Sequence, residues 1–343
     1  MNIFVHRVGV KGGAQLVMKK VVEVLDKLRD EFDLYIVCSL DGIDECKLCD
    51  EVFNYNQLLP SSFGDVVSNL LLQRKLSSKH FDIVITHSLL PPNLVNNSQY
   101  TITFDGRDWS DFIKTRNLVG KLVEYIPWRI REVQYKNSVI FLINPENRDY
   151  YFRLHPQKVF FVPNGVDVGL VSSIPPVPKV YDFGFLGRFS PEKNPYLVME
   201  AFKNTRFSGI MIGANDNYKV GNIYIKKFMK RKDALREIKK ARIGILPSLH
   251  EGFPLVLLEF LVLGIPVIVS DSVKTPVDTF VIKFKCCDRD SLLSTFLHVY
   301  DNYPYYQKKA LKNRRIIIKK FNWEKTLESS LRRVIAEVKM SSY

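Results

Sequence analysis

The sequence predicts an α/β protein of two doubly wound, parallel-sheet domains that face a common cleft, and three observations support this prediction. Short apolar runs alternate with longer stretches of helical periodicity, and strands that alternate with helices form parallel β-α-β units. The alternation breaks once, at a Pro- and Gly-rich stretch, and then resumes. The chain of 343 residues is also longer than one hydrophobic core usually supports.

The first series begins with a strand over residues 2–5, which leads through Gly12-Gly13 into a helix from Ala14 to Leu28. Helical patterns separate most of the strands that follow. These further strands are predicted at Leu34–Val37, Ile83–Thr86, Thr101–Phe104 and Val139–Ile143.

The break in the alternation lies at Val162–Asp167 and again at Ile174–Pro178, so we expect the linker between the domains here. A first domain should therefore span residues 1–163. The second series contains predicted helices at Pro195–Phe202, Asp233–Ala241 and Pro254–Leu263. Its predicted strands are Asp182–Leu186, Gly209–Ile212, Ile243–Leu246, Pro266–Ser270 and Phe280–Phe284.

The charge of the chain is uneven along the sequence. Residues 1–165 hold 20 basic and 19 acidic residues and the remainder 30 and 17, so the two parts carry +1 and +13. Most of the excess lies in Lys226–Arg242 and Lys308–Lys320. A positive field favours a phosphate-bearing partner, which could be a nucleotide, a nucleic acid or an anionic membrane surface. A solvated basic helix face explains each cluster equally well.

Cysteine usage and the apolar segments favour a cytoplasmic protein. The five cysteines include the pair Cys46 and Cys49, but no second pair or His cluster completes a zinc site, so we expect reduced thiols. The first seven residues are too poor in apolar side chains for a signal peptide. The longest apolar stretch, Phe253–Val269, is interrupted by Glu259 and Gly264, which predicts a buried helix and strand rather than a membrane span.

The loop after the Ile243–Leu246 strand is the strongest candidate site, because ligands of open parallel sheets bind beyond the carboxyl ends of the strands. Pro254 suits the first turn of a helix, and Gly264 suits the left-handed position after it. The amides of Gly252, Phe253 and Leu255 should then face a phosphate. Glu259 lies on this apolar helix and needs a partner, either sugar hydroxyls or a basic neighbour.

A second candidate loop follows the Asp182–Leu186 strand. Arg188 and Lys193 lie on one strand-to-helix turn beside Gly187. Two cations there would stabilise a diphosphate leaving group as its charge develops. Solvation of both side chains is the simpler alternative.

The first half contributes two weaker signals. Gly12-Gly13 allows close approach of a ligand to the backbone, but it lacks the spacing of a dinucleotide-binding motif and the ending of a P-loop. This argues against a dehydrogenase and a nucleoside triphosphatase. Asp105, together with His87 at the end of the preceding strand, would place polar groups toward the cleft, although Asp105 also suits a helix cap.

The motifs together resemble the retaining glycosyltransferases of GT-B architecture, family 4 among them, also called glycosyl transferases group 1. That family has a glutamate within a Pro-Ser-x-x-Glu-Gly-Phe stretch and a second glutamate after seven intervening residues, and Glu251 and Glu259 match these positions here. The matches are collinear over nearly the whole chain. They also include Gly12-Gly13, Pro163–Asp167, Gly187-Arg188 with Glu192-Lys193, and Phe321-Asn322-Trp323.

The resemblance implies specific roles for these residues. Glu259 should bind the ribose hydroxyls of the donor, Glu251 the sugar hydroxyls, and Arg188 and Lys193 the pyrophosphate. The helix from Trp323 should cross back to the first domain, which divides the rest of the chain into 164–322 and 323–343. Further donor contacts are expected from Gly12, Gly13, Met229 for the base, Gly252, Phe253, Pro254 and Leu255.

One departure concerns the first domain. Asp105-Gly106 stands where the family commonly has His-Gly, and a carboxylate lacks the donor capacity of a neutral imidazole. His87 resembles a second His of the family. We therefore group Asp105, His87 and Glu251 as the catalytic candidates, while the donor sugar is not specified.

The implied reaction transfers a hexosyl group from a nucleoside diphosphate sugar, UDP- or GDP-linked, to an acceptor hydroxyl with retention. Cations and a helix N-terminus would replace a metal, and no cofactor besides the nucleotide sugar is expected. Asp288-Arg289-Asp290 matches a metal-binding Asp-x-Asp only superficially, since it precedes the helical pattern Ser291–Val299 and suits a helix cap.

Two other interpretations concern partners, because the acceptor itself can be a glycan, a lipid or a protein. A basic nucleic-acid-binding protein, or a DNA-modifying glycosyltransferase, would use the +13 part of the chain, but nucleic-acid motifs are lacking. Peripheral contact with a membrane would use Phe112–Lys136, where apolar and basic residues mix as in an interfacial helix. Packing of that helix on its own sheet is the alternative.

Overall fold

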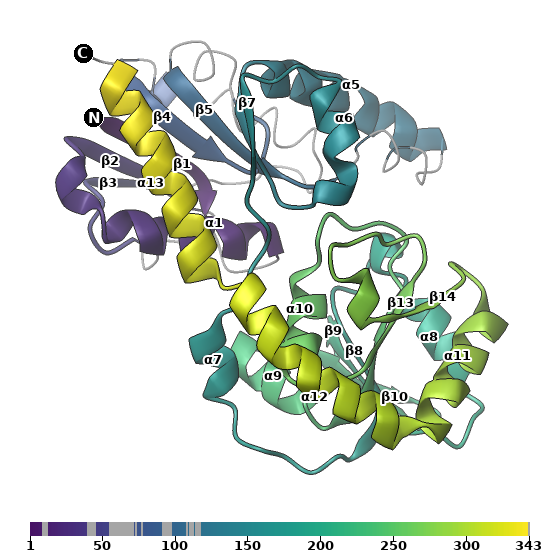
Figure 1. Ribbon diagram of the computed structural model, residues 1–343. Coiled ribbons are helices and arrows are strands. Elements are labelled where there is room, and N and C mark those ends of the chain that lie inside the picture. The colour runs from purple at the N-terminus through teal and green to yellow at the C-terminus, as the bar shows by residue number, and fades with distance from the viewer. Residues whose placement is uncertain are drawn as a thin grey trace. The chain divides into compact units, whose positions relative to one another are not determined.

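The computed structural model describes residues 1–8, 13–39, 46–54, 72, 74–76, 78–90, 98–107, 109, 113 and 118–341. The chain divides into two compact units (Figure 1). The first comprises Met1–Asn164 together with Trp323–Tyr343, and the second comprises Gly165–Asn322.

Within its described residues the first unit contains a seven-stranded sheet in the order β3-β2-β1-β4-β5-β6-β7, and every pair of neighbours is parallel. The order runs outward in both directions from β1 and β4, as in a doubly wound fold. The strands are β1 (Asn2–Val8), β2 (Leu34–Ser39), β3 (Glu51–Asn54), β4 (Phe81–Thr86), β5 (Ser98–Asp105), β6 (Val139–Leu142) and β7 (Lys158–Phe161).

Helices from both ends of the chain pack on the first unit. Figure 1 shows α13 (Trp323–Ser341) beside α1 (Gly13–Asp26), and the two helices are in contact. Ion pairs fasten α13 to this unit: Lys158 meets Glu337 at 2.8 Å and Lys339 meets Glu31 at 2.9 Å. The other helical segments are η1 (Arg29–Glu31), α5 (Leu118–Lys136), η3 (Pro145–Asn147) and α6 (Arg148–Phe152).

The second unit contains a seven-stranded sheet in the order β10-β11-β9-β8-β12-β13-β14. Only the edge pair β10 and β11 is antiparallel among these strands, which all lie in the fully described stretch 165–322. The strands are β8 (Tyr181–Leu186), β9 (Gly209–Ala214), β10 (Tyr218–Val220), β11 (Ile223–Lys227), β12 (Ala241–Leu246), β13 (Val267–Ser270) and β14 (Ile282–Phe284).

Helices cover both faces of this second sheet, and a buried hydrophobic cluster lies between the sheet and the helices on each face. Ile210 and Ile212 of β9 belong to the cluster under α9, α10 and α12, while Met211 belongs to the cluster under α8 and α11. Side chains alternate between the faces of a strand, so each strand contributes to both cores. The helical segments are α7 (Val168–Ser172), η4 (Pro191–Lys193), α8 (Pro195–Phe202), α9 (Arg231–Ile238), α10 (Leu255–Val262), η5 (Asp278–Phe280), α11 (Arg289–Asp301) and α12 (Tyr303–Lys320).

The predicted fold class is confirmed, and most predicted strands lie inside the observed ones. Several boundaries were wrong, and two of them have a clear physical reason. Ala241 belongs to buried β12 rather than to the preceding helix, which ends at Ile238. The strand predicted from Phe280 starts only at Ile282, because residues 278–280 form a 3-10 turn held by the Phe280 amide bonding to the Val277 carbonyl.

Candidate active site

The second sheet has its topological switch point between β8 and β12. Strand β8 leads outward to β9 on one side, whereas β12 leads to β13 and β14 on the other. Ligands of open α/β sheets bind in the crevice outside the carboxyl ends of the strands at such a point. The loops that follow β8 and β12 are the two in which the sequence placed Arg188, Lys193 and Glu251.

A close approach of two backbones shapes the loop after β8. The Gly187 amide donates to the Ile212 carbonyl at 3.0 Å. Gly213 has a φ of +120°, and a Cβ there would lie 2.2 Å from the Gly187 carbonyl oxygen. Gly213 is therefore required for the course of the Gly187-Arg188 turn, although no sequence motif identified it. The Arg188 side chain is largely exposed and pairs with Glu192 at 3.2 Å.

The loop after β12 is tied to the loop after β8. Lys193 forms an ion pair with Glu251, and the Ser248 hydroxyl donates to the same Glu251 oxygen at 2.8 Å. The Leu249 amide donates to the Glu192 carbonyl at 2.9 Å. Glu251 is buried, with 7% of its side chain exposed. Glu251 and Lys193, predicted separately, thus form one charged cluster at the switch point.

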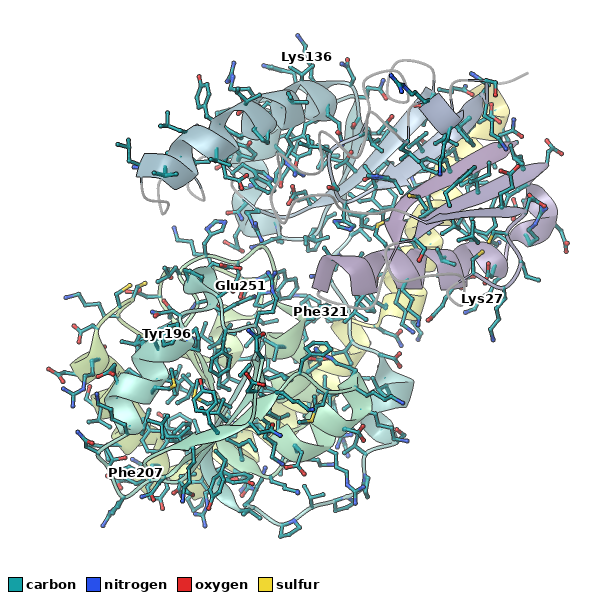
Figure 2. The ribbon with its side chains drawn as sticks, turned by 180° about the vertical axis from the view of Figure 1, so that it is seen from behind. Lys27, Lys136, Tyr196, Phe207, Glu251 and Phe321 are labelled. Carbon is teal, nitrogen blue, oxygen red and sulfur yellow. The ribbon has the colours of Figure 1, made fainter. Side chains whose placement is uncertain are left out.

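Figure 2 labels Glu251 and Phe207 at opposite ends of this unit. Phe207 precedes β9, and Glu251 follows β12, so the two mark the amino and carboxyl edges of the parallel strands. A third loop joins the carboxyl edge, because Ser272 after β13 donates to the Ser248 carbonyl at 3.1 Å. The candidate site therefore lies on one edge of the sheet, within one unit.

The start of α10 lies next to this cluster. Pro254 occupies the N-cap in an extended conformation and Leu255 is the first helical residue, one position later than predicted. No side chain of the described residues caps this helix end. Phe253 is buried against Phe321, with ring centroids 5.4 Å apart (Figure 2 labels Phe321). Gly264, with a φ of +72°, ends the helix in the left-handed conformation that was predicted.

Glu259 and Arg231 form a pair inside the second unit. Arg231 Nε donates to Glu259 Oε1 at 2.7 Å, and Arg231 Nη2 contacts Oε2. Burial raises the pKa of Glu259, the Arg231 guanidinium opposes that rise, and Asp167 adds to it. The basic neighbour that the sequence left open as a partner is therefore present. The ribose role of Glu259 stays a prediction, and Arg231 was not distinguished from the other cations of its cluster.

Met229 lies between β11 and α9 and is partly buried against the core below α10. The preceding residue, Phe228, is fastened by its amide to the Ala214 carbonyl at 3.0 Å, while its side chain is exposed. The backbone beside Met229 is thus anchored to the carboxyl end of β9. Its predicted contact with the base stays a prediction.

The first unit has its own switch point between β1 and β4. His87 directly follows β4 and is half-buried, so it lies at the carboxyl edge where it was expected. Gly13 is the first residue of α1, whereas Gly12 lies outside the described residues.

Asp105 ends β5, and its carboxylate accepts bonds from its own surroundings. Oδ1 accepts from the amides of Gly106 at 2.7 Å and Arg107 at 3.1 Å, and Oδ2 accepts from Trp109 Nε1 at 2.6 Å and from the Tyr135 hydroxyl. Four donors match the acceptor capacity of a carboxylate. Asp105 therefore organises the start of the loop that follows β5, and its catalytic role stays a prediction.

Two further sequence features have structural explanations. Asp288 caps α11 by accepting from the Ser291 amide at 2.9 Å, as predicted, and this hydrogen bond lowers its pKa. All five cysteines are free. Cys46 contacts Asp26 at 3.6 Å, and burial raises the pKa of its thiol.

Much of the basic cluster Lys226–Arg242 is engaged within the second unit. Lys226 and Lys240 both pair with Glu237, and Lys239 donates to the Ile174 carbonyl at 2.9 Å. Arg231 is held by Glu259. Four of the nine cations in this cluster therefore have structural partners within the unit.

Comparisons with known proteins address the family and the fold. The family model of glycosyl transferases group 1 matches residues 173–285. The UDP-Gal:alpha-D-GlcNAc-diphosphoundecaprenol alpha-1,3-galactosyltransferase of Escherichia coli is 27% identical over 341 residues, covering 84% of this chain and 85% of that protein.

Solved structures agree in fold at low sequence identity. WaaG, a glycosyltransferase involved in lipopolysaccharide biosynthesis, has a TM-score of 0.75 at 12% identity, covering 98% of this chain and 99% of that one. Anabaena HepE in complex with UDP has a TM-score of 0.67 at 13% identity, covering both chains fully. The protein is therefore a glycosyltransferase of GT-B fold that uses a nucleotide sugar, and its residues 173–285 match the glycosyl transferases group 1.

Proposed function

We propose that this glycosyltransferase moves a hexosyl group from a UDP-sugar to a hydroxyl of a lipid-linked glycan, with retention at the anomeric carbon. The observation that carries the proposal is the cluster of Lys193, Ser248 and Glu251 at the switch point of the second sheet. It brings a cation and a carboxylate to the edge where the fold binds ligands.

The donor site would work by exchange of partners. Lys193 and Arg188 are each paired with a carboxylate, and a bound diphosphate offers both cations a more highly charged anion. Released from Lys193, Glu251 becomes an acceptor for sugar hydroxyls, while Ser248 still orients it. The amides at the start of α10 would add a further phosphate contact. These groups would stabilise the charge that develops on the leaving diphosphate.

The choice of UDP and of a lipid-linked acceptor is supported by relatives. The E. coli protein is named for transfer from UDP-Gal to a diphosphoundecaprenol-linked GlcNAc with an α-1,3 linkage. A fold relative has been solved with UDP. Since the anomeric phosphate of UDP-galactose is itself α, an α product corresponds to retention.

A lipid-linked acceptor requires access to a membrane, and α5 suits that contact. Leu118, Leu122 and Ile126 follow one another at intervals of one helical turn and are 61–75% exposed. Lys121 and Arg129 lie on the same helix and are exposed as well. Apolar and basic side chains on one surface helix favour an anionic membrane surface. Among the described residues no helix is both long and apolar enough to cross a bilayer.

Donor use is tested by thermal unfolding with UDP-sugars and GDP-sugars. A ligand at about 100 times its dissociation constant adds about 2.7 kcal/mol, which corresponds to about 5–11 °C for a domain of this size. Lys193→Ala should abolish the shift, while Lys203→Ala, which removes an exposed cation paired with Glu200, should keep it. Absence of a shift with every nucleotide sugar would contradict the proposal. The anomeric proton coupling of the product, measured by NMR, then tests retention.

Membrane contact is tested by sedimentation with vesicles. Wild-type protein should bind vesicles that contain anionic phospholipid more strongly than purely zwitterionic ones, and binding should fall with salt. Leu122→Glu with Ile126→Glu should lose this binding, whereas Val180→Glu, at an exposed apolar position in the second unit, should not. Equal sedimentation of all three proteins would rule out α5 as the docking helix.

A further inference from the structure

The Arg231–Glu259 pair connects the first residue of α9 with the second turn of α10. The Glu259 side chain is 12% exposed and that of Arg231 is 31% exposed. Two contacts join the guanidinium to the two carboxylate oxygens. This geometry fixes the plane of the carboxylate as well as its position.

Neither partner is explained by the stability of its own helix. A cation at a helix N-terminus opposes the helix dipole, and Arg231 stands there between Lys230 and Lys232. Glu259 lies on a helix whose other inward residues are apolar, including Leu255, Leu258 and Val262. Replacing such a buried pair by apolar side chains is often neutral or stabilising. A buried pair that does not favour its own helices is a candidate for ligand binding.

Hydrogen-bond capacity indicates what that role is. An ionised carboxylate has about four acceptor positions, and the two contacts from Arg231 occupy two of them. The remaining two match the two hydroxyl donors of a ribose diol. Arg231 has no acceptor of its own, so it cannot replace Glu259 as the acceptor of these hydroxyls.

We infer that Arg231 is a positioning residue, which holds the Glu259 carboxylate so that its two unoccupied acceptor positions receive the 2′- and 3′-hydroxyls of the donor ribose. The inference rests on the proposed function, because it assumes that a nucleoside diphosphate sugar occupies this site. Arg231 acts only by positioning Glu259 and does not contact the reacting atoms.

The charges around Glu259 make the inference testable by pH. Asp167, the N-cap of α7, acts on Glu259 in the same direction as burial, and both raise its pKa. Arg231 is the cation that opposes them. Helix α12 packs on α10, and its buried residues, Ala310, Asn313 and Ile317, are all uncharged. Removing the charge of Arg231 should therefore raise the pKa of Glu259 further, so that a protonated carboxyl faces the ribose at lower pH.

The experiment measures the dissociation constant of UDP by calorimetry for wild type, Arg231→Gln, Arg231→Lys and the control Lys232→Gln, from about pH 6 to 8.5. Lys232 is the adjacent exposed residue, so its variant removes the same charge without the contact. Arg231→Gln should weaken UDP binding about tenfold to hundredfold at neutral pH and recover part of the loss as the pH rises. Arg231→Lys should keep the wild-type pH profile, and Lys232→Gln should bind as wild type does.

A second nucleotide separates action through the ribose from other effects. With 2′-deoxy-UDP, which lacks one hydroxyl, the loss caused by Arg231→Gln should be clearly smaller than with UDP. The same loss for both nucleotides at every pH would overturn the inference, because Arg231 would then act on the phosphates or on the fold. If Arg231→Gln does not fold, the same comparison with Arg231→Lys decides. Failure of wild type to bind either nucleotide would instead refute the proposed function, and the inference with it.

Discussion

Replacement of Lys193 by Met should destabilise the second unit as well as abolish transfer. Lys193 pairs with Glu251, and only 20% and 7% of the two side chains are exposed. Met fills the volume of the lysine stem, so the change removes the charge and leaves the packing nearly unaltered. Glu251 then remains buried with one hydrogen bond, from Ser248, and without a counter-charge.

The size of the effect follows from that burial. Breaking a buried ion pair from one side costs about 3–5 kcal/mol, and the remaining Ser248 bond places this case at about 3 kcal/mol. For a domain of this size, that corresponds to a decrease in Tm of about 6–12 °C. The double variant Lys193→Met with Glu251→Gln removes the orphan charge. The amide oxygen that Glu251→Gln introduces can still accept a hydrogen bond from Ser248. Its loss should be only about 1 kcal/mol, so the coupling is about 2 kcal/mol plus the loss that Glu251→Gln causes alone.

Differential scanning calorimetry of wild type, both single variants and the double variant measures this coupling, and a donor-turnover assay accompanies it. The double variant should be more stable than Lys193→Met while remaining inactive. Lys203→Met, which changes an exposed ion pair of the same unit, serves as the control and should shift Tm little. A Lys193→Met protein as stable as wild type, or single effects that simply add, would refute the argument.

Three other changes give expected outcomes. Asp105→Asn should destabilise the first unit by about 2–4 kcal/mol, measured by denaturant unfolding. The amide group of the new side chain would face hydrogen-bond donors such as the Tyr135 hydroxyl. Unchanged stability would show that the hydrogen bonds of Asp105 contribute little. Gly213→Ala should weaken UDP binding by displacing the Gly187 turn, since its Cβ would lie 2.2 Å from the Gly187 oxygen, whereas normal binding would mean that the turn adapts. Burial, with two neighbouring cations, lowers the pKa of Lys179 to about 8 from 10.5. Between these values the unfolded chain binds the extra proton, so stability should rise with pH by about 1–3 kcal/mol, and Lys179→Met should lack this rise in pH-dependent unfolding.

Local features of the chain were predictable because they depend on neighbours a few residues away. The helix cap at Asp288 is a bond to a residue three positions on, and the left-handed turn at Gly264 follows from the end of one helix. The alternation of apolar and helical patterns likewise predicted β8, β9 and β12, and with them the edge that holds the candidate site.

The edge strands β10 and β11 were not predicted, because β10 is short and exposed and its partner begins only after a tight turn at Gly221. The terminal helix was placed by resemblance to the family rather than by its own pattern. Its ion pairs, such as Lys339 with Glu31, join residues 308 positions apart.

The sequence by itself determined which segments form strands and helices, and it placed Arg188, Lys193, Glu251 and Glu259 on loops and helix ends suited to a nucleotide sugar. Only the tertiary structure decided the partners of these groups. Arg231 and Glu259 are 28 positions apart, and Lys193 and Glu251 are 58 apart. The physical reason is that the charge and orientation of a buried side chain depend on whatever packs against it, which no local pattern of residues specifies.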